Sequence, residues 1–582
     1  MREPFRLACR NLALTALVCA ALFSCQANGP GPADDESDDG PPVAPWFEDV
    51  TDEVGLNFVH DAGPVGSYFM PQAIGSGAAV FDLNNDGLVY IYLLQNGGPN
   101  SKSTNRLYKR MPDGHFKVVE GSGLEIAGYN MGVAIGDVNN DGLPDVLVTQ
   151  FGGIKLFLNN GDGTFTDITD EAGLQNPGWG VSAAFVDFDR DGWLDLVVVN
   201  YVDYDPDWPC STNTSRRDYC NPRSFPGRVT RLFRNLGRDA NAKVEGKGRG
   251  VRFQDVTESS GLGRLPGPGL GVVCADFDGD GWPDIFVAND GQPNRLWINQ
   301  HNGTFSEEAV RRGVAYNRMA QAEAGMGVAL GDFFGDGMLG LYVTHLTEET
   351  NTLWRQEPRG LFRDWTAKTD LTRGRWRGTG FGTVAGDFNH DGALDLAVVN
   401  GRVNKADASA NESLGPHWGL YAERNQLFVN DGAGRFRDVS PWNRAFCGTP
   451  NVARGLTAGV FNNKTGALDL LVTTIAGRAR LYRNVCPNRG HWLLVRAVDP
   501  ELGGRDAYGA EIHVKAGDRK WLRLINPASS YLCSGDPRAH FGLGPVDRVE
   551  AIEVRWPDGK IEKFNGCNAD QVLVLKKGAS NH

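Results

Sequence analysis

The sequence predicts an all-β fold: a seven-bladed β-propeller closed by an N-terminal strand, followed by a small C-terminal β domain. Three observations lead to this prediction. A set of four short strands recurs about every 50 to 90 residues from 46 to 485. An acidic nine-residue loop recurs between the first two strands of each set. Beyond residue 486 the repeat ends and the composition changes. Radial repetition of four-stranded blades protects the strand edges, which makes a propeller the economical arrangement.

The first 25 residues are predicted to be a signal peptide. Arg2, Arg6 and Arg10 precede an apolar stretch that is too short to span a bilayer. The sequence Leu-Phe-Ser-Cys ending at Cys25 resembles the bacterial lipobox, whose cysteine is lipidated after processing. We therefore expect an exported lipoprotein in the outer membrane, at the cell surface or in the periplasm, with secretion as the alternative. Residues 26–45 are predicted to be a disordered acidic tether.

The acidic loop is complete at residues 276–284. It places side-chain oxygens at positions 1, 3, 5 and 9 and a glycine at position 6, an arrangement suited to Ca²⁺, which takes six to eight oxygens at about 2.3–2.6 Å. An EF-hand would need a glutamate at position 12, where Val287 stands in a strand-like run. Four complete copies favour calcium over simple Asp-Gly turns. The predicted side-chain ligands are Asp137, Asn139, Asp141, Asp145, Asp187, Asp189, Asp191, Asp195, Asp276, Asp278, Asp280, Asp284, Asp387, Asn389, Asp391 and Asp395, and the predicted carbonyl ligands are those of Leu143, Trp193, Trp282 and Ala393.

Three further copies of the loop are incomplete. One keeps Asp82, Asn84 and Asp86 but has Tyr90 at position 9, so a weak site is expected there. The copy at 332–340 keeps two aspartates, and the copy at 461–469 keeps only the last one. The sequence therefore predicts about four calcium ions.

Counting the strands predicts how the ring closes. There are seven third strands, with sequences such as Arg-Leu-Tyr, and seven fourth strands that begin with phenylalanine. The first fourth strand, at Phe47, precedes every acidic loop, and none follows the last third strand at 480–482. We expect Phe47 and its neighbours to complete the last blade.

These repeats resemble the FG-GAP/VCBS family, the unit of the integrin α-subunit propeller. Phe381-Gly382 followed by Ala385-Gly386-Asp387 carries the motif, and the acidic positions of the four complete loops match the calcium ligands of the family. Residues 486–578 resemble the ASPIC/UnbV domain, through segments such as Ser530-Tyr531-Leu532 and the run from 538 to 544. The resemblance implies a calcium-binding propeller with a C-terminal β domain and leaves the partner open.

The cysteines favour an oxidising compartment. Seven remain beyond the leader, so one must be unpaired. We expect pairs between Cys210 and Cys220, between Cys447 and Cys486, and between Cys533 and Cys567, with Cys274 buried and free.

The net charge of −13 argues against a nucleic-acid partner. Fourteen aspartates lie in the four complete loops, and four Ca²⁺ would bring the charge to about −5. We expect contact with a membrane only through a lipid anchor.

A ligand is expected on the side of the propeller away from the acidic loops. Both long insertions, 200–230 and 400–425, project there, together with connections between blades. Aromatic residues and arginine are enriched in binding surfaces. The candidate residues are Arg373, Arg375, Trp376, Arg377, Trp208 and Trp418.

Two functions fit these features. The first is an extracellular binding or adhesion scaffold for a protein or an anionic glycan. The second is a lyase-like enzyme acting on a polysaccharide. The sequence shows no catalytic constellation of His, Tyr and Lys outside the loops, so a non-enzymatic scaffold is the prediction.

Overall fold

The computed structural model describes residues 41–210, 217–238, 250–374, 376–528 and 530–579. The predicted lipidation site Cys25, the signal peptide and most of the tether lie outside this range, as does Arg375. Among the described residues, no helix has both the length and the hydropathy that crossing a bilayer requires.

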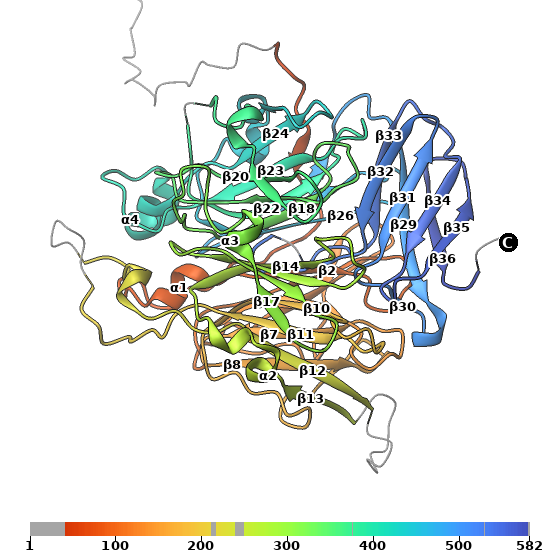
Figure 1. The fold of residues 1–582 in the computed structure, drawn as a ribbon. Coiled ribbons are helices and arrows are strands. Elements are labelled where there is room, and N and C mark those ends of the chain that lie inside the picture. The colour runs from red at the N-terminus through yellow and green to blue at the C-terminus, as the bar shows by residue number, and fades with distance from the viewer. Residues whose placement is uncertain (1–40, 211–216, 239–249, 375, 529, 580–582) are drawn as a thin grey trace, which may run out of the picture. The chain divides into compact units, whose positions relative to one another are not determined.

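Residues between Phe47 and Asn484 form seven four-stranded antiparallel sheets in the described part of the chain, consistent with propeller blades (Figure 1). The predicted third and fourth strands all lie in these sheets in the predicted order. The first six sheets are β2 (Ala78–Phe81), β3 (Tyr90–Leu93), β4 (Arg106–Arg110) and β5 (Phe116–Val118); β6 (Asn130–Gly136), β7 (Asp145–Gln150), β8 (Gly153–Asn159) and β9 (Phe165–Asp167); β10 (Gly180–Val186), β11 (Asp195–Asn200), β12 (Arg231–Arg238) and β13 (Val251–Asp255); β14 (Gly269–Ala275), β15 (Asp284–Asn289), β16 (Arg295–Asn299) and β17 (Phe305–Glu307); β18 (Val328–Gly331), β19 (Gly340–Val343), β20 (Thr352–Gln356) and β21 (Phe362–Asp364); β22 (Gly380–Gly386), β23 (Asp395–Asn400), β24 (Gln426–Asn430) and β25 (Phe436–Asp438).

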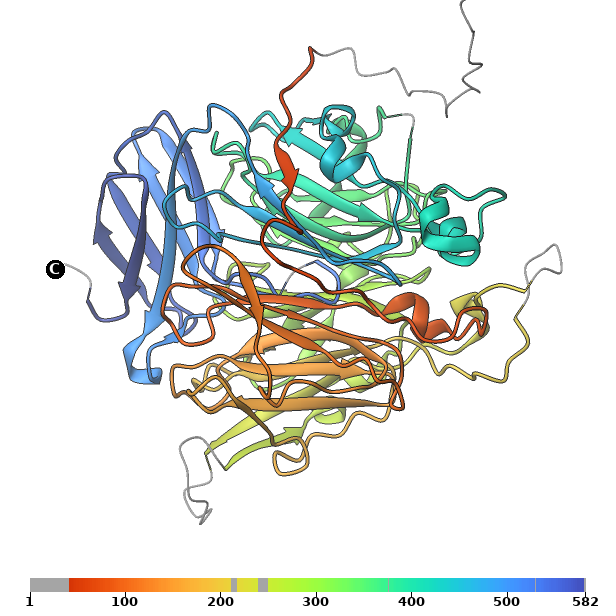
Figure 2. The ribbon, with the colours of Figure 1, turned by 180° about the vertical axis from the view of Figure 1, so that it is seen from behind.

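The seventh sheet combines the two ends of the repeat region. It contains β26 (Ala453–Gly459), β27 (Asp469–Thr474) and β28 (Arg480–Asn484), and its fourth strand is β1 (Phe47–Asp49). In this antiparallel pair, Phe47 faces Asn484 and Asp49 faces Tyr482. Figure 2 shows the N-terminal strand, in red, beside strands drawn in blue. Phe47 is buried against Phe388 and Phe446, so apolar packing supports the pairing.

The first strand of each sheet packs against the first strands of its neighbours. Contacts run from β2 to β6, β10, β14, β18, β22 and β26 in turn, and β26 contacts β2. Small residues allow this approach: a Cβ added at Gly382 of β22 would lie 2.5 Å from the backbone nitrogen of Leu456 in β26. The small-residue strands that the sequence places before each acidic loop therefore pack closely against one another.

Two sheets form the C-terminal region. In the first, β29 (His491–Asp499) pairs with β30 (Arg505–Asp506), β33 (Ala539–Gly544) and, in parallel, β36 (Gln571–Lys576). In the second, the order is β32 (Arg519–Leu524), β31 (Glu511–Ala516), β34 (Ala551–Arg555) and β35 (Ile561–Asn565). A buried apolar core that includes Trp521, Phe541 and Trp556 lies between them. Figure 1 shows these strands together at one side of the repeat sheets.

The described residues 526–528 and 530–536, which we call the central segment, lie between β32 and β33. The segment pairs with first strands as an extra strand would: Ser534 N donates to Ala78 O at 3.0 Å, and Ser530 N donates to Val328 O at 2.7 Å. Its Tyr531 is fully buried against Phe381. The sequence motif Ser-Tyr-Leu at 530–532 thus lies among the repeat sheets and not within the C-terminal sandwich.

The helices are short and lie in connections. They are α1 (Met70–Ile74), α2 (Thr257–Ser260), α3 (Ala309–Arg312), α4 (Gly415–Trp418) and α5 (Arg444–Cys447).

One predicted disulfide is present and two are not. Cys210 and Cys220 are bonded, and Cys274 is buried and free as expected. Cys533 and Cys567 do not pair because Cys533 packs against the first and last repeat sheets, whereas Cys567 packs on the core of the C-terminal region. Cys447 and Cys486 share one buried core but stay free, and the Cys486 thiol donates to Pro487 O at 3.7 Å.

Candidate metal centres

Each complete acidic loop folds around the carboxylate at its first position. In the loop that begins at Asp137, Oδ1 accepts from Asp141 N at 3.2 Å and Oδ2 from Gly142 N at 2.8 Å. Gly142 has a φ of 86°, a left-handed conformation that glycine adopts without strain. The equivalent oxygens of Asp187, Asp276 and Asp387 accept from the glycine at position 6 in the same way. The spacing seen in the sequence therefore produces the same loop four times.

The aspartate at position 9 connects the loop to the sheet. Asp145 is fully buried; its Oδ2 accepts from Val138 N and its Oδ1 from Asn159 N, both at 2.9 Å. Asp195, Asp284 and Asp395 accept from the equivalent pair of backbone amides. These bonds fix the ninth carboxylate before any cation arrives.

Sequence reasoning missed the asparagine that ends the third strand. Asn235 Nδ2 donates to Leu194 O within its own sheet at 3.1 Å and to Val138 O in the preceding loop at 2.9 Å. Each of these asparagines contacts the preceding loop; the set is Asn159, Asn235, Asn299, Asn430 and Asn484. The sequence contains a pattern that could have identified these asparagines, because each one stands three residues after the leucine of its third strand. Five pairs of neighbouring loops are therefore linked in the described part of the chain.

Two loops bring three carboxylates together. Oxygens of Asp187, Asp189 and Asp195 lie within 4.8 Å of one another, and so do those of Asp276, Asp278 and Asp284. Asp187 Oδ1 is buried and has no hydrogen-bond partner among the described residues. Burial raises the pKa of Asp187 to about 7 and that of Asp284 to about 8. Such closely spaced, desolvated carboxylates fit a bound cation, and an all-oxygen donor set suits a hard one.

The other two complete loops have asparagine at position 3 and so one carboxylate fewer. Asn139 Oδ1 accepts from Asp141 N at 2.9 Å, which places the amide beside the acid. Burial raises the pKa of Asp137 to about 6 and that of Asp387 to about 7. These loops share with the acidic triads the bonds from the glycine at position 6 and to the ninth aspartate, and they carry a lower charge. They differ at Oδ1 of the first aspartate, which accepts from the amide at position 5 here but not in the triads.

The incomplete loops at 82 and 332 keep the fold but lose one and two, respectively, of the four side-chain ligands. Asp82 and Asp332 accept from the glycine at position 6, as in the complete loops. At position 9 stand Tyr90 and Gly340, and at position 3 of the second loop Phe334 packs against Trp365. A cation in either loop would lack the buried ninth carboxylate.

The comparisons with known proteins agree with this geometry. Residues 82–148, 137–198, 276–343 and 332–398 match the FG-GAP-like repeat, and residues 501–582 match the ASPIC and UnbV family. The chain carries FG-GAP-like repeats and an ASPIC and UnbV domain. It is a distant homologue of cartilage acidic protein 1: it is 27% identical to the Mus musculus protein over 541 residues (87% of this chain, 74% of the relative) and 26% identical to the Homo sapiens protein over 540 residues (87% and 72%).

Solved structures of low similarity also align. One is BBS1N in complex with ARL6DN, with 10% identity, a TM-score of 0.37 and coverage of 77% of this chain and 99% of that one. Another is an Agrocybe aegerita protein described as recognising non-reducing terminal N-acetylglucosamine, with 14% identity, a TM-score of 0.33 and coverage of 71% and 86%. At these TM-scores neither likeness adds to the assignment.

The ASPIC and UnbV domain contacts the acidic loops of the FG-GAP-like repeats. Arg505 is 4% exposed, and its Nη1 donates to Asn140 Oδ1 at 2.8 Å and to Gly192 O at 3.1 Å, so it joins two loops. Arg519 Nη2 donates to Asp391 O at 2.7 Å, and Gly544 N donates to His390 O at 2.7 Å. The acidic loops are therefore partly covered by this domain.

The predicted ligand residues are only partly exposed. Trp418 is buried among Tyr219, His417 and Tyr421, so its prediction as a surface residue is wrong. It closes the apolar core of the 400–425 insertion. Trp208 is 51% exposed, and the half-buried Trp376 lies beneath the Arg424 guanidinium at 5.3 Å. Arg373 is exposed and pairs with Asp370 at 3.0 Å, and Arg377 Nη1 donates to Thr350 Oγ1 at 3.2 Å.

The two insertions meet a third segment. The ring of Tyr68 packs against Tyr219 and His417, at centroid distances of 5.5 and 5.4 Å. Lys405 Nζ donates to the Tyr68 hydroxyl at 2.5 Å, and Arg217 lies over the Tyr68 ring at 5.3 Å. We call these five residues, together with Trp376 and Arg424, the insertion surface. Figures 1 and 2 show α1 and α4, which neighbour it, on the side away from β29–β36.

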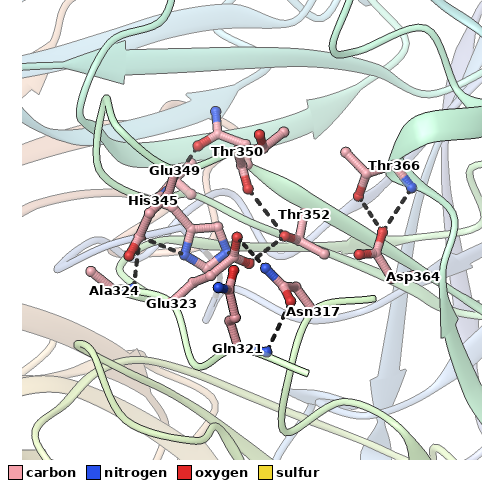
Figure 3. Close-up of polar contacts among 12 residues, drawn as sticks. Asn317, Gln321, Glu323, Ala324, His345, Glu349, Thr350, Thr352, Asp364 and Thr366 are labelled. Carbon is pink, nitrogen blue, oxygen red and sulfur yellow. Dashed lines mark hydrogen bonds and ion pairs between the residues drawn. The ribbon is translucent and has the colours of Figure 1, made fainter. Parts of the chain in front are cut away.

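A second group that the sequence did not reveal surrounds His345. The imidazole is fully buried between Glu323 and Glu349, with Nε2 3.5 Å from Glu323 Oε2 and Nδ1 4.0 Å from Glu349 Oε2 (Figure 3). Thr352 Oγ1 donates to Glu323 Oε2 at 2.8 Å, and Ala324 N donates to Glu349 Oε2 at 2.8 Å. Burial lowers the pKa of His345 to about 4, so the ring is neutral, and neither ring nitrogen has a hydrogen-bond partner among the described residues.

Proposed function

We propose that this chain is an exported, calcium-binding β-propeller that acts as an extracellular binding or adhesion scaffold for a protein or an anionic glycan. The proposal takes residues 46–485 as a seven-bladed propeller and 486–578 as the ASPIC/UnbV domain. The circular order of contacts between first strands and the pairing of β1 with β28 support a closed ring. The leader supports export, anchored through Cys25 or secreted. The proposal includes no catalytic step.

Four Ca²⁺ ions are assigned to the complete loops beginning at Asp137, Asp187, Asp276 and Asp387. The side chains at positions 1, 3, 5 and 9 and the carbonyl at position 7 would hold each ion. Bound calcium would supply the positive charge that lets these buried carboxylates stay ionised. The observation that carries this assignment is the Asp187 loop, where a buried carboxylate oxygen without a partner faces two further acids. The role of the ions is structural, because the loops connect the strands of each blade.

The insertion surface is assigned to the ligand. Segments around residues 68, 217 and 405 are far apart in the sequence and converge there on aromatic rings. Arg217 and Lys405 make no ion pair with any described acid. Unpaired cations beside aromatic faces suit an acidic partner, and charge of this kind raises association rates and specificity. The opposite side, partly covered by the ASPIC and UnbV domain, is less available.

Replacing Arg373, Arg375 and Arg377 together by Ala, with Trp376 kept, is expected to abolish or strongly weaken binding to an acidic glycan. These arginines flank Trp376, and the exposed Arg373 and Arg377 contribute little to stability. Binding of the full chain to immobilised heparin would be measured over a range of salt concentrations. The double variant Arg217→Gln/Lys405→Gln should reduce the same binding.

The matched control is Arg548→Gln on the C-terminal region, an exposed arginine that contacts only Asn568 among the described residues. It should bind like the wild type. The assignment of this surface would be contradicted if both variants bound heparin as tightly as the wild type and if wild-type binding did not change with salt concentration.

A further inference from the structure

The central segment contacts the first strand of every repeat sheet. Because it stands among all seven strands, it occupies the position where a closed propeller has its channel. The contacts are Val80 N to Ser534 O at 3.0 Å, Val133 N to Leu532 O at 3.1 Å, Leu532 N to Ser182 Oγ at 3.4 Å, Asn526 Nδ2 to Cys274 O at 3.3 Å, Val328 N to Ser530 O at 3.0 Å, Thr383 N to Ser530 Oγ at 3.0 Å and Asp536 N to Ala458 O at 3.3 Å.

The strands that flank the central segment are held by the acidic loops. Arg519 lies on β32 and bonds the carbonyl of Asp391, and Gly544 ends β33 and bonds the carbonyl of His390. On β30, Arg505 joins the loops at 137 and 187. On the loop side, the acceptors are three backbone carbonyls and the side chain at position 4. These contacts therefore need the loop backbone in its folded conformation.

The loop conformation in turn depends on charge. The loops at 137 and 387 each contain three aspartates and those at 187 and 276 contain four. The carboxylates of one triad lie within 4.8 Å of one another and are desolvated, so they repel strongly when ionised. A divalent cation leaves a residual charge of −1 or −2 in each loop.

We propose that calcium in the acidic loops keeps the central segment in its position among the first strands, an effect that we call the latch. When the loops lose calcium, the central segment would leave this position, while the repeat sheets themselves stay folded. The inference rests on the calcium assignment made above. Thermodynamic linkage requires the reverse effect as well: a chain whose domain cannot contact the loops must bind calcium more weakly by the same factor.

The reactivity of the Cys533 thiol reports directly whether the central segment is in place among the first strands. Cys533 lies in the central segment and is 6% exposed, whereas Cys447 is 3% exposed in α5, away from every hydrogen bond of the central segment. The full-length chain would be treated with a maleimide in buffered calcium and in EDTA, and labelled peptides quantified by mass spectrometry. We expect labelling of Cys533 to be at least tenfold faster in EDTA while Cys447 stays protected.

Substitutions test the coupling in the other direction. Arg505→Lys keeps the positive charge beside the loops but loses the guanidinium fork that joins two of them. It is expected to raise the calcium Kd about tenfold and to speed labelling of Cys533 at subsaturating calcium. Arg548→Lys, in the same domain but away from the loops, should change neither. If Arg505→Lys does not fold, Arg519→Lys serves the same purpose, because its side chain is less buried and contacts only the loop at 387 among the four.

The outcomes separate the latch from the calcium assignment. A chain that binds no calcium overturns both. A chain that binds calcium but shows unchanged Cys533 labelling in EDTA, or exposes Cys533 and Cys447 at the same rate, keeps the calcium sites and overturns the latch. Faster labelling of Cys533 alone, with weaker calcium binding by the Arg505 variant, supports it.

Discussion

Removing calcium with EDTA is expected to lower the melting temperature of the full chain by about 10 °C or more. Calcium binds the folded loops and not the unfolded chain, so it stabilises by mass action, by about 2.7 kcal/mol per site at ~100-fold excess over Kd. Four sites would contribute about 11 kcal/mol, and for a chain of this size that corresponds to a shift of about 10 °C. Thermal unfolding followed by circular dichroism in calcium and in EDTA measures the effect.

Magnesium provides the control for this experiment. Mg²⁺ demands near-octahedral geometry at about 2.0–2.1 Å and keeps its waters, so it should restore little of the lost stability. A melting temperature that EDTA leaves unchanged would contradict the structural role given to the ions.

Deleting residues 46–56 is expected to destabilise the chain severely and to cause aggregation. The deletion removes β1 and with it five buried apolar side chains: Trp46, Phe47, Val50, Val54 and Leu56. At about 1.5–3 kcal/mol for each side chain, the loss is on the order of 10 kcal/mol. It also exposes the edge of β28 to pairing with other chains. Light scattering and thermal unfolding of the purified variant measure both effects.

Deletion of residues 26–40 is the matched control, because it shortens the N-terminus and leaves β1 in place. Its melting temperature and scattering should equal those of the wild type. Equal behaviour of the two deletions would mean that β1 does not close the ring.

The repeat sheets could be predicted because local pattern and fold agree in them. The small residues of β22, the oxygens of the loop that follows it and the apolar run of β23 are adjacent in sequence. The pairing of β1 with β28 also followed from the sequence, since counting strands left one at each end.

The contacts between distant segments could not be predicted. Nothing in Ser530-Tyr531-Leu532 shows that it hydrogen-bonds to first strands that are hundreds of residues earlier. Glu323, His345 and Glu349 meet only because the connections on either side of β18 and β19 fold together. Trp418 looked like a surface residue because it lies in a long insertion, yet the insertion has its own core. Cysteine spacing likewise did not separate Cys533 from Cys567.

Counting the bound calcium tests the central claim most directly. The full chain would be equilibrated with buffered calcium, and the ions per chain counted by native mass spectrometry. We predict four ions for the wild type, three for Asp280→Ala in a complete loop, and four for Asp86→Ala in the incomplete loop at 82. A wild-type count of one or none, or an equal loss of calcium in the two variants, would contradict the account.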